Sequence, residues 1–480
     1  MISLSGYFDY KEDIKTILVI AEHDNTCDLL LKLCTIKHDL KKLYLAGNSK
    51  KRLAKMVSVL KRTAEQNSSF HLPQITLVPY LKTIEYSFET PVDAVLFDSN
   101  VKRAAILSTK SLKPAYLIGK LWRDYVPCFH LWEEFRPVCR HIHMECIGKA
   151  NKIDVIDWNR NSRNEVELSV VFPVYNVAKY LEQCIASVTA WKAPYVEFLF
   201  VNDGSPDHSR EIILEHAKSD PRIKLIDKEN GGCASARKRG MEEAKGRYIG
   251  FVDPDDFVEP SMFKKLFSRA LIGSYDVCYS GYNAFYENSG KVERMSDALG
   301  DEYSQGTSDK LAIHKLMVYL RVAIWRGIYR RDFLMENQIT FQEQIRRFDD
   351  LPFKVEVFAK AKSVVAVPEY LYYYRLERPG QDVACDDDRL FVHFDIFDHL
   401  NQEIGALKDR KLLDFLQLSK VQTHCFTLQK IQKKFLKEYC ERAKEDLRAN
   451  EMSVFRTVLL IAKYFGRDNL KTYLKIMMSR

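Results

Sequence analysis

Three aspartates lie close together near the middle of the chain. Asp253, Asp255 and Asp256 directly follow the short apolar segment 248–252. Ligands of open α/β sheets bind beyond the carboxyl ends of strands, and neighbouring carboxylates repel one another. A divalent cation relieves that repulsion, and Mg²⁺ prefers oxygen ligands together with substrate phosphates. The spacing therefore predicts a metal–diphosphate site. The alternative is a solvated acidic turn in which Asp255 or Asp256 caps the helix after Pro260.

A turn of small residues and a basic helix precede these aspartates. Asn230, Gly231 and Gly232 open a helical pattern that carries Arg237. Backbone N–H groups at a helix N-terminus, with a cation nearby, suit a phosphate group, although such a turn also occurs without a ligand. Asp203 ends an earlier apolar segment and could accept hydrogen bonds from a base or a ribose. Its alternative role is an Asx turn.

Alternating strands and helices are expected to position these residues. Between residues 167 and 300, short apolar segments alternate with helical patterns, which predicts a mostly parallel sheet flanked by helices. The expected strands lie at residues 168–175, 196–201, 223–226 and 248–252.

Residues 1–160 show a similar alternation, which predicts an N-terminal Rossmann-like α/β domain. Its first strand–helix turn, at residues 21–25, lacks a glycine-rich phosphate loop, and the sequence does not reveal the domain's role. The polar residues 157–166 are expected to form a linker. Apolar segments lie at residues 16–21, 43–46, 75–78, 94–97 and 115–118.

A cluster of Cys and His residues near the end of this region contains the residue types that bind zinc. Cys139, His141, His143 and Cys146 are close in sequence, but their spacing matches no common zinc pattern. An alternating strand that carries these residues is the simpler interpretation.

The composition is that of a soluble protein with several domains. The 480 residues are 46% hydrophobic and 29% charged, which permits a large buried core. The eleven cysteines form no Cys-x-x-Cys pair, which favours a reducing, cytoplasmic compartment. The N-terminus lacks the pattern of a secretory signal, and no apolar run is long enough to span a membrane.

The C-terminal residues 386–480 are expected to form a basic, helical extension. Residues 401–480 contain 17 lysines and arginines against 9 aspartates and glutamates, a difference equal to the +8 charge of the whole chain. The last amphipathic pattern, with Lys463 nearby, suits an anionic membrane surface or a partner helix. The alternative is packing on the preceding domain.

No nucleic-acid-binding module is recognised. Helical patterns cover residues 389–400, 412–435 and 455–465.

Four motifs occur in order and at suitable spacing. They are Phe172-Pro-Val-Tyr-Asn176, Val201-Asn-Asp-Gly-Ser205, Asn230-Gly-Gly232 with Ala236-Arg237, and Phe251-Val-Asp-Pro-Asp-Asp256. Together they resemble the nucleotide-sugar-binding half of a family 2 glycosyltransferase with the GT-A fold. The resemblance implies a GT-A catalytic domain at residues 161–385. It also implies inverting transfer of a sugar from a nucleoside diphosphate sugar, with Mn²⁺ or Mg²⁺.

The resemblance further implies which residues bind the nucleotide. Pro173, Tyr175 and Asp203 would contact the nucleoside, and Asp253 would contact the ribose or the nucleotide side of the metal site. Arg237 would lie near the phosphate groups.

Metal ligands and cations are implied in the same way. Asp255 would hold the metal that bridges the diphosphate, with Asp256 in support. Some family members carry a metal-binding His after the arginine that corresponds to Arg375; here Glu377 is the candidate third ligand. Arg375 and Arg378, helped by Gln381, would meet the leaving diphosphate, whose charge needs cations.

The segment Phe348-Asp-Asp-Leu-Pro-Phe353 resembles the family's Glu-Asp-x-x-Phe motif, with Asp349 in place of Glu. The second acidic residue of that motif is the general base, which implies Asp350. An inverting transfer needs a carboxylate to take the proton of the attacking hydroxyl. The alternative is that the two carboxylates stabilise a helix N-terminus, which fits Asp349 better.

These expectations describe a cytoplasmic glycosyltransferase of bacterial type, peripheral on the inner face of the cytoplasmic membrane. It would use a UDP-sugar and a saccharide or lipid-linked acceptor in the synthesis of surface polysaccharide or lipooligosaccharide. Two alternatives stay open. A nucleotidyltransferase that makes a sugar nucleotide would share the sheet and the metal but release pyrophosphate. A non-catalytic assembly protein would not need the aspartates.

Overall fold

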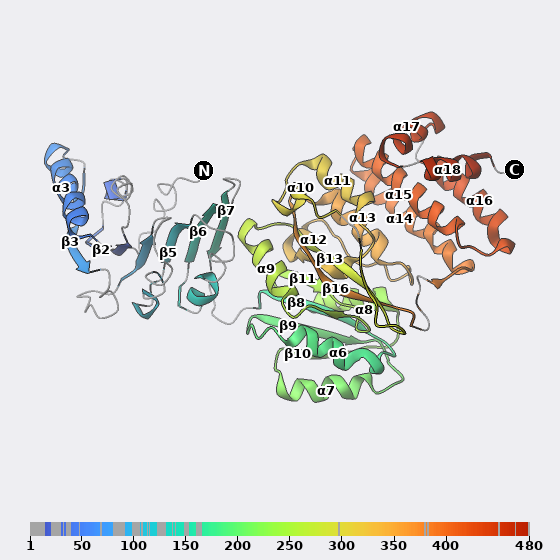
Figure 1. Ribbon diagram of the computed structural model, residues 1–480, viewed down its shortest axis with the longest axis horizontal. Helices are drawn as coiled ribbons and strands as arrows, with labels where there is room; N and C mark the ends of the chain where they lie inside the picture. The colour runs from blue at the N-terminus through green and yellow to red at the C-terminus, as the bar shows by residue number, and fades with distance from the viewer. Residues whose placement is uncertain are drawn as a thin grey trace. The chain divides into compact units, whose positions relative to one another are not determined.

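The computed structural model describes residues 166–478, apart from short gaps at 296–297, 379–380, 382–383, 450–451 and 466. Between residues 15 and 159 it describes the strands and parts of the helices and turns. The chain divides into two compact units, one made of Met1–Asn164 with Leu271–Ser274 and the other of Glu165–Ala270 with Tyr275–Arg480. Each unit has its own sheet (Figure 1).

In the described part of the first unit, seven strands form a sheet in the order β3-β2-β1-β4-β5-β6-β7. The strands from β3 to β6 are parallel, and β7 runs antiparallel to β6. Helix α3 (Lys50–Gln66) begins after Ser49, whose hydroxyl accepts the N–H of Arg52. The expected N-terminal α/β domain is confirmed. The strands are β1 (Thr16–Ile20), β2 (Lys42–Gly47), β3 (Gln74–Pro79), β4 (Ala94–Phe97), β5 (Tyr116–Leu121), β6 (His141–Ile147) and β7 (Ile153–Asn159).

Two expectations for this unit change in detail. β7 continues to Asn159, so the predicted linker begins later than residue 157. Cys139 is buried, and His141, His143 and Cys146 lie in β6, but the side chains of these three are outside the described residues. The preferred interpretation, a strand that carries these residues, is confirmed by β6, and the zinc alternative is not tested.

The second unit is built on a mixed sheet in the order β10-β9-β8-β11-β15-β13-β16-β12, with β14 paired to β13. β10, β9, β8 and β11 are parallel, and β15 joins β11 antiparallel. Every residue of β8, β9 and β11 is buried, as expected for parallel strands covered on both faces. The strands are β8 (Leu168–Val174), β9 (Val196–Asn202), β10 (Ile223–Asp227), β11 (Tyr248–Phe251), β12 (Phe257–Val258), β13 (Val277–Tyr286), β14 (Val292–Arg294), β15 (Gly327–Arg330) and β16 (Val364–Leu376).

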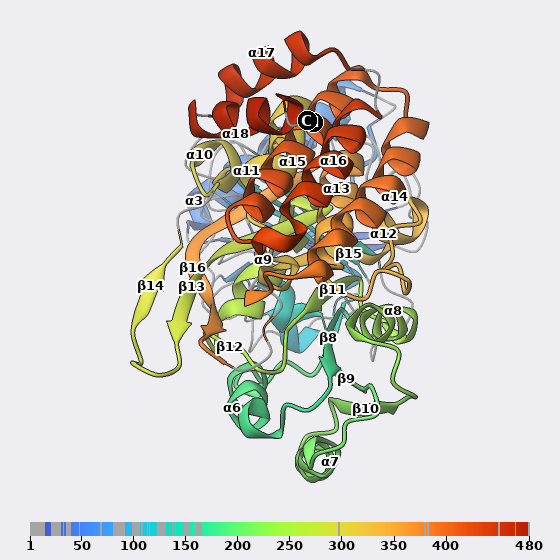
Figure 2. The same ribbon diagram turned by 90° about the vertical axis from the view of Figure 1, so that its right-hand side faces the viewer.

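Helices connect and cover these strands (Figure 2). Helix α8 packs on β8 and β9. At Gly240 of α8, an added Cβ would lie only 2.2 Å from Cγ1 of Val171 in β8, so the glycine permits a close approach of helix and strand. The helices before residue 361 are α6 (Ala178–Thr189), α7 (Ser209–Ser219), α8 (Cys233–Glu243), α9 (Met262–Gly273), α10 (Asp301–Ser304), α11 (Lys310–Tyr319), α12 (Arg331–Glu336) and α13 (Asp350–Lys360).

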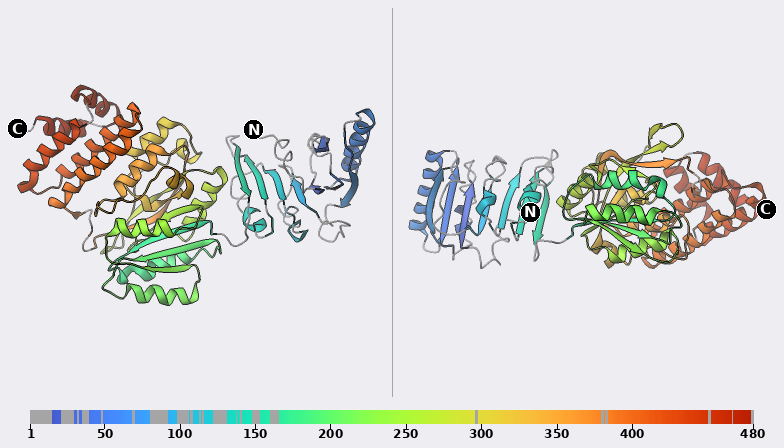
Figure 3. Two further views of the ribbon diagram at one scale, coloured as in Figure 1. Left: turned by 180° about the vertical axis from the view of Figure 1, so that it is seen from behind. Right: turned by 90° about the horizontal axis from the view of Figure 1, so that it is seen from below.

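The C-terminal helices belong to the same unit (Figure 3). Helix α14 packs on α13, and α15 packs on α11. The helix expected at residues 412–435 is two helices, α15 and α16. Among the described residues, none of the helices combines the length and apolar character that a membrane crossing requires. The helices are α14 (Val392–Ala406), α15 (Arg410–Leu428), α16 (Lys433–Arg448), α17 (Val454–Tyr464) and α18 (Arg467–Met478).

Candidate active site

The carboxyl ends of three adjacent parallel strands bring the nucleotide-site candidates together. β9, β8 and β11 are neighbours in the sheet. Asp203 follows β9, Tyr175 follows β8, and Asp253 lies two residues beyond β11. Tyr175 is 50% exposed, whereas Pro173 is buried within β8. The tyrosine ring is therefore the more accessible of these two for contact with a ligand.

Asp203 holds the turn that begins helix α8. Its Oδ1 accepts hydrogen bonds from the backbone N of Gly231 at 2.9 Å and from Nζ of Lys228 at 2.6 Å, and its Oδ2 accepts from the backbone N of Gly232 at 2.8 Å. Gly232 has a φ of 90°, which side chains with a Cβ rarely adopt. These contacts reach residues distant in sequence, so Asp203 does more than form a local Asx turn.

Arg237 lies between two of the acidic motifs. Its Nη2 donates to Oδ1 of Asp253 at 2.6 Å, and its Nη1 donates to Oδ2 of Asp349 at 2.8 Å. The arginine side chain is buried, and the guanidinium lies over the ring of Phe341, 5.7 Å from its centroid. A single cation therefore joins the end of β11 to the start of α13.

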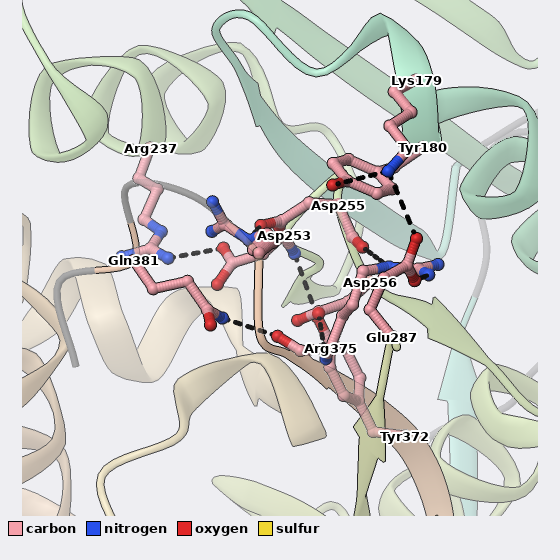
Figure 4. A network of polar contacts seen from close by, with 11 residues as sticks. Lys179, Tyr180, Arg237, Asp253, Asp255, Asp256, Glu287, Tyr372, Arg375 and Gln381 are labelled. Atoms are coloured by element: carbon pink, nitrogen blue, oxygen red, sulfur yellow. Dashed lines mark hydrogen bonds and ion pairs between the residues drawn. The ribbon is translucent and has the colours of Figure 1, made fainter. Parts of the chain in front are cut away.

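The two aspartates after Asp253 have different partners (Figure 4). Asp256 accepts hydrogen bonds from the hydroxyl of Tyr372 at 2.8 Å and from the backbone N of Arg375 at 2.7 Å. Burial and the charges of Asp255 and Asp253 raise the pKa of Asp256 well above its usual value. Its expected part in the metal site is not supported, because both of its oxygens fasten the turn to β16.

Asp255 keeps a position suited to a cation. Its carboxylate forms an ion pair with Arg378, which is 28% exposed. Burial raises the pKa of Asp255 to about 6, and the charge of Asp253 adds to this, while Arg378 opposes it. Burial disfavours the ionised form of a carboxylate, and a nearby cation stabilises it. A divalent metal ion with oxygen ligands can supply that charge.

Arg375 supports the same turn from β16. Its Nε donates to the backbone O of Asp255 at 2.7 Å, its Nη2 donates to Oε1 of Gln183 at 2.6 Å, and its Nη1 pairs with Glu287. The side chain is also buried. The expected contact of Arg375 with the leaving diphosphate is therefore not supported, because these protein groups already occupy its guanidinium.

The residues after β16 also depart from expectation. Glu377 is exposed, and its Oε2 accepts the backbone N–H of Asn288 at 3.2 Å. In the described parts of the chain, no group of three or more His, Cys, Asp or Glu side chains is arranged to hold a metal ion. The role of Glu377 as a third ligand stays a prediction. Gln381 donates from Nε2 to the backbone O of Arg375 at 2.6 Å. Arg378 forms an ion pair with Asp255, and its contact with a phosphate stays a prediction.

Asp350 is the first residue of α13. Burial, together with the charge of Asp349, raises its pKa to about 7, and Arg237 opposes the shift. Asp349 is hydrogen-bonded to Arg237, whereas a backbone hydrogen bond acts on the carboxylate of Asp350 and lowers its pKa slightly against the effect of burial. The preceding Phe348 has a φ of 54°, a strained conformation of the kind that clusters at functional sites. A carboxyl group whose pKa lies near neutral pH can act as a general base.

Some residues of this network were missed by the sequence interpretation. Gln183 and Glu287 lie 192 and 88 residues from Arg375, so no local pattern connects them. The hydroxyl of Tyr372 donates a hydrogen bond to Asp256. A tyrosine in a buried strand carries no sequence signal for the partner of its hydroxyl.

Comparisons with known proteins relate part of the chain to one family. Residues 169–336 match the family model described as Glycosyl transferase family 2. The uncharacterized glycosyltransferase EpsJ of Bacillus subtilis (strain 168) is 36% identical over 217 residues, which cover 44% of this chain and 62% of that protein. A poly(ribitol-phosphate) beta-glucosyltransferase of Bacillus spizizenii (strain ATCC 23059 / NRRL B-14472 / W23) is 26% identical over 225 residues, covering 46% of this chain and 34% of that protein. The match thus spans less than two thirds of either relative.

A solved structure resembles the chain more distantly. The crystal structure of S. aureus TarS 1–349 in complex with UDP-GlcNAc superposes with a TM-score of 0.49 at 21% identity, over 65% of this chain and 91% of that chain. The segment 169–336 contains the strand ends after β8, β9 and β11 on which the site is built. This part of the chain belongs to glycosyl transferase family 2.

Proposed function

We propose that the chain is a metal-dependent, inverting glycosyltransferase. It moves a sugar from a nucleoside diphosphate sugar to a hydroxyl group of a saccharide or lipid-linked saccharide. The observation that carries the proposal is the pair of acidic sites that Arg237 connects: Asp253 and Asp255 after β11, and Asp349 and Asp350 at the start of α13. Relatives that are named glycosyltransferases, one of them a poly(ribitol-phosphate) beta-glucosyltransferase, support a role in making a surface polymer.

The donor is proposed to be a UDP-sugar held at the ends of β8 and β9. The ring of Tyr175 is exposed beside this edge, where it can stack on a flat base. The carboxylate of Asp203 is fixed by two backbone N–H groups and has acceptor capacity left for the N–H of uracil. Asp253 is proposed to contact the ribose.

The acidic residues fit Mn²⁺ or Mg²⁺. Asp255 supplies an oxygen ligand whose ionisation is disfavoured by burial and by Asp253, and a divalent cation would reverse both effects. Mg²⁺ is commonly held by one or two carboxylates, with substrate phosphates and water completing its shell. When bound, the ion would neutralise charge on the leaving diphosphate. Arg378 would add a second positive charge at the same place.

Asp350 is proposed to take the proton of the acceptor hydroxyl. The hydroxyl oxygen attacks the anomeric carbon while the bond from that carbon to the diphosphate breaks on the opposite side, which inverts the configuration. A base is most effective when its pKa lies near the working pH, and the pKa of Asp350 is raised to about 7.

The C-terminal helices are proposed to meet an anionic membrane surface, which would place the enzyme on the inner face of the cytoplasmic membrane, close to a lipid-linked acceptor. Helix α17 exposes Phe455 (73%) and Leu459 (53%), and Lys463 on the same helix is exposed as well. An exposed apolar face flanked by lysines is typical of interfacial helices.

A panel of nucleotide sugars, tested with Mn²⁺ or Mg²⁺, examines the proposal. Release of nucleoside diphosphate from one UDP-sugar, lost on adding chelator and in Asp255→Asn, is the expected result. Release of pyrophosphate from a nucleoside triphosphate would indicate a nucleotidyltransferase instead. Absence of both donor hydrolysis and donor binding in calorimetry would favour a non-catalytic protein.

A further inference from the structure

We propose that Arg237 is a positioning residue for the general base, holding the start of α13 against the end of β11, and not a ligand of the donor diphosphate. This inference rests on the proposed role of Asp350. It assigns the arginine of the third motif to the acceptor side of the reaction, whereas its place in the sequence suggested the phosphates.

The contacts of Arg237 join parts of the chain that are far apart in sequence. Asp349 lies 112 residues after Arg237, and Asp253 lies 16 residues after it. The two hydrogen bonds use different nitrogens of one planar guanidinium, so the angle between the two carboxylates is fixed. Because Asp350 follows Asp349 directly, the position of the base depends on this bridge.

The surroundings of Arg237 leave little access for a phosphate. The residue is 4% exposed. Nη1 and Nη2 already donate to carboxylates, and Nε is buried without a hydrogen-bond partner among the described residues. The ring of Phe341 covers the guanidinium. A diphosphate at this position would have to displace Asp253 or Asp349 from a buried ion pair, which is costly.

Helix α8 is itself anchored, which makes the bridge rigid. The turn before it is fixed by Asp203, and Gly240 allows the helix to lie directly against β8. Arg237 lies between these two anchors on the helix. Side chains on rigid elements hold catalytic groups more precisely than side chains on loops.

Several charged or titratable groups act on Asp350. Asp349 precedes it on the same element, Arg237 and Cys233 come from α8, Asp253 follows β11, and Tyr329 comes from β15. Arg237 is the cation in this set. Removal of Arg237 should therefore make the position of Asp350 less fixed and raise the pKa of Asp350.

The test compares Arg237→Gln and Asp349→Asn with Lys238→Gln in the full-length chain. Lys238 lies on the same helix but pairs with Glu343 at the surface, so its substitution serves as the matched control. Donor affinity is measured by calorimetry with Mn²⁺, and kcat is measured across the pH range. Asp349→Asn is close in shape to the native residue and leaves Asp253 as a partner for Arg237, which protects the fold.

We expect Asp349→Asn, which keeps the contact between Arg237 and Asp253, to change donor Kd by less than about 3-fold. In Arg237→Gln, kcat should fall by about 10- to 100-fold, which is part of the usual contribution of a general base. The acid limb of its pH profile should move to higher pH. In an Asp350→Asn background, Arg237→Gln should lower the residual rate by less than about 3-fold, because the two residues act as a unit.

A large rise in donor Kd for Arg237→Gln, with an effect on rate that adds fully to that of Asp350→Asn, would overturn the proposal and return Arg237 to the diphosphate. If Asp349→Asn keeps the wild-type kcat and pH profile, the bridge does not position the base. Failure of the wild-type chain to transfer from any nucleotide sugar is a different result and would instead contradict the proposed function.

Discussion

The hydroxyl of Tyr372 donates a hydrogen bond of 2.8 Å to Asp256, a carboxylate that is 1% exposed and 116 residues away in the chain. The backbone N–H of Arg375, on the same strand, donates to the other oxygen of Asp256. These two hydrogen bonds to β16 therefore hold the turn that carries Asp253 and Asp255. Asp256 contributes to the site by its structural role in this turn.

Removal of the tyrosine hydroxyl should loosen this turn. Tyr372→Phe leaves a buried carboxylate without one of its donors, which typically costs about 1–3 kcal/mol. We expect a lower urea midpoint and weaker Mn²⁺-dependent donor binding by calorimetry. Tyr286→Phe is the control, since that hydroxyl bonds Glu293 at an exposed site. Equal effects of the two variants would argue against a special role of Tyr372.

The contact between Gly240 and Val171 predicts an unusually sensitive position in α8. In Gly240→Ala, the new methyl group would meet Val171 within 2.2 Å, and overpacking of this kind costs about 1–3 kcal/mol. The displaced helix should also lower kcat through Arg237. Gly405→Ala in α14 meets nothing within 4 Å and should be neutral or slightly stabilising by urea unfolding. A neutral Gly240→Ala would contradict the close packing of α8 on β8.

The raised pKa of Asp350 predicts the pH dependence of transfer. The base must be ionised to accept a proton, and its pKa is about 7. The value of kcat should therefore fall tenfold per pH unit below about 7, where the protonated form dominates. A rate that stays constant down to pH 5, with saturating donor and metal, would exclude Asp350 as the group that limits the reaction.

The exposed face of α17 predicts attachment to membranes. The double variant Phe455→Ser with Leu459→Ser should lose flotation with liposomes that contain anionic lipid, and high salt should weaken the flotation of the unmodified chain. Val292→Ser, at a residue 50% exposed in β14, should leave flotation unchanged. If the unmodified chain does not float at low salt, the membrane proposal fails.

Much of the site could be predicted from local patterns. Residues at the ends of β8, β9 and β11 form contiguous motifs, because each strand and the turn after it come from one stretch of sequence. Asp203, Asp253 and Asp255 were placed correctly at one edge of the sheet for this reason. The α/β character of both units was evident from the alternation of apolar segments and helical patterns.

The partners across the sheet could not be predicted. The family resemblance implied a phosphate contact for Arg375, but its guanidinium is occupied by Gln183 and Glu287, which only the folded chain brings near. Glu377 lay near the position of a family ligand in sequence, yet its carboxylate bonds Asn288. Such pairings depend on tertiary packing, which leaves no periodic signal in the sequence.

The most direct test of the account compares the unmodified chain with Asp350→Asn, using the donor identified in the nucleotide-sugar panel. The donor Kd of Asp350→Asn in the presence of Mn²⁺ should stay within about 3-fold of the value for the unmodified chain, because an amide and a carboxylate have the same shape. Transfer to acceptor should fall by about 10²- to 10⁴-fold, the usual contribution of a general base. Near-normal transfer by Asp350→Asn would contradict the assignment of Asp350 as the general base, and another group would then have to take the proton.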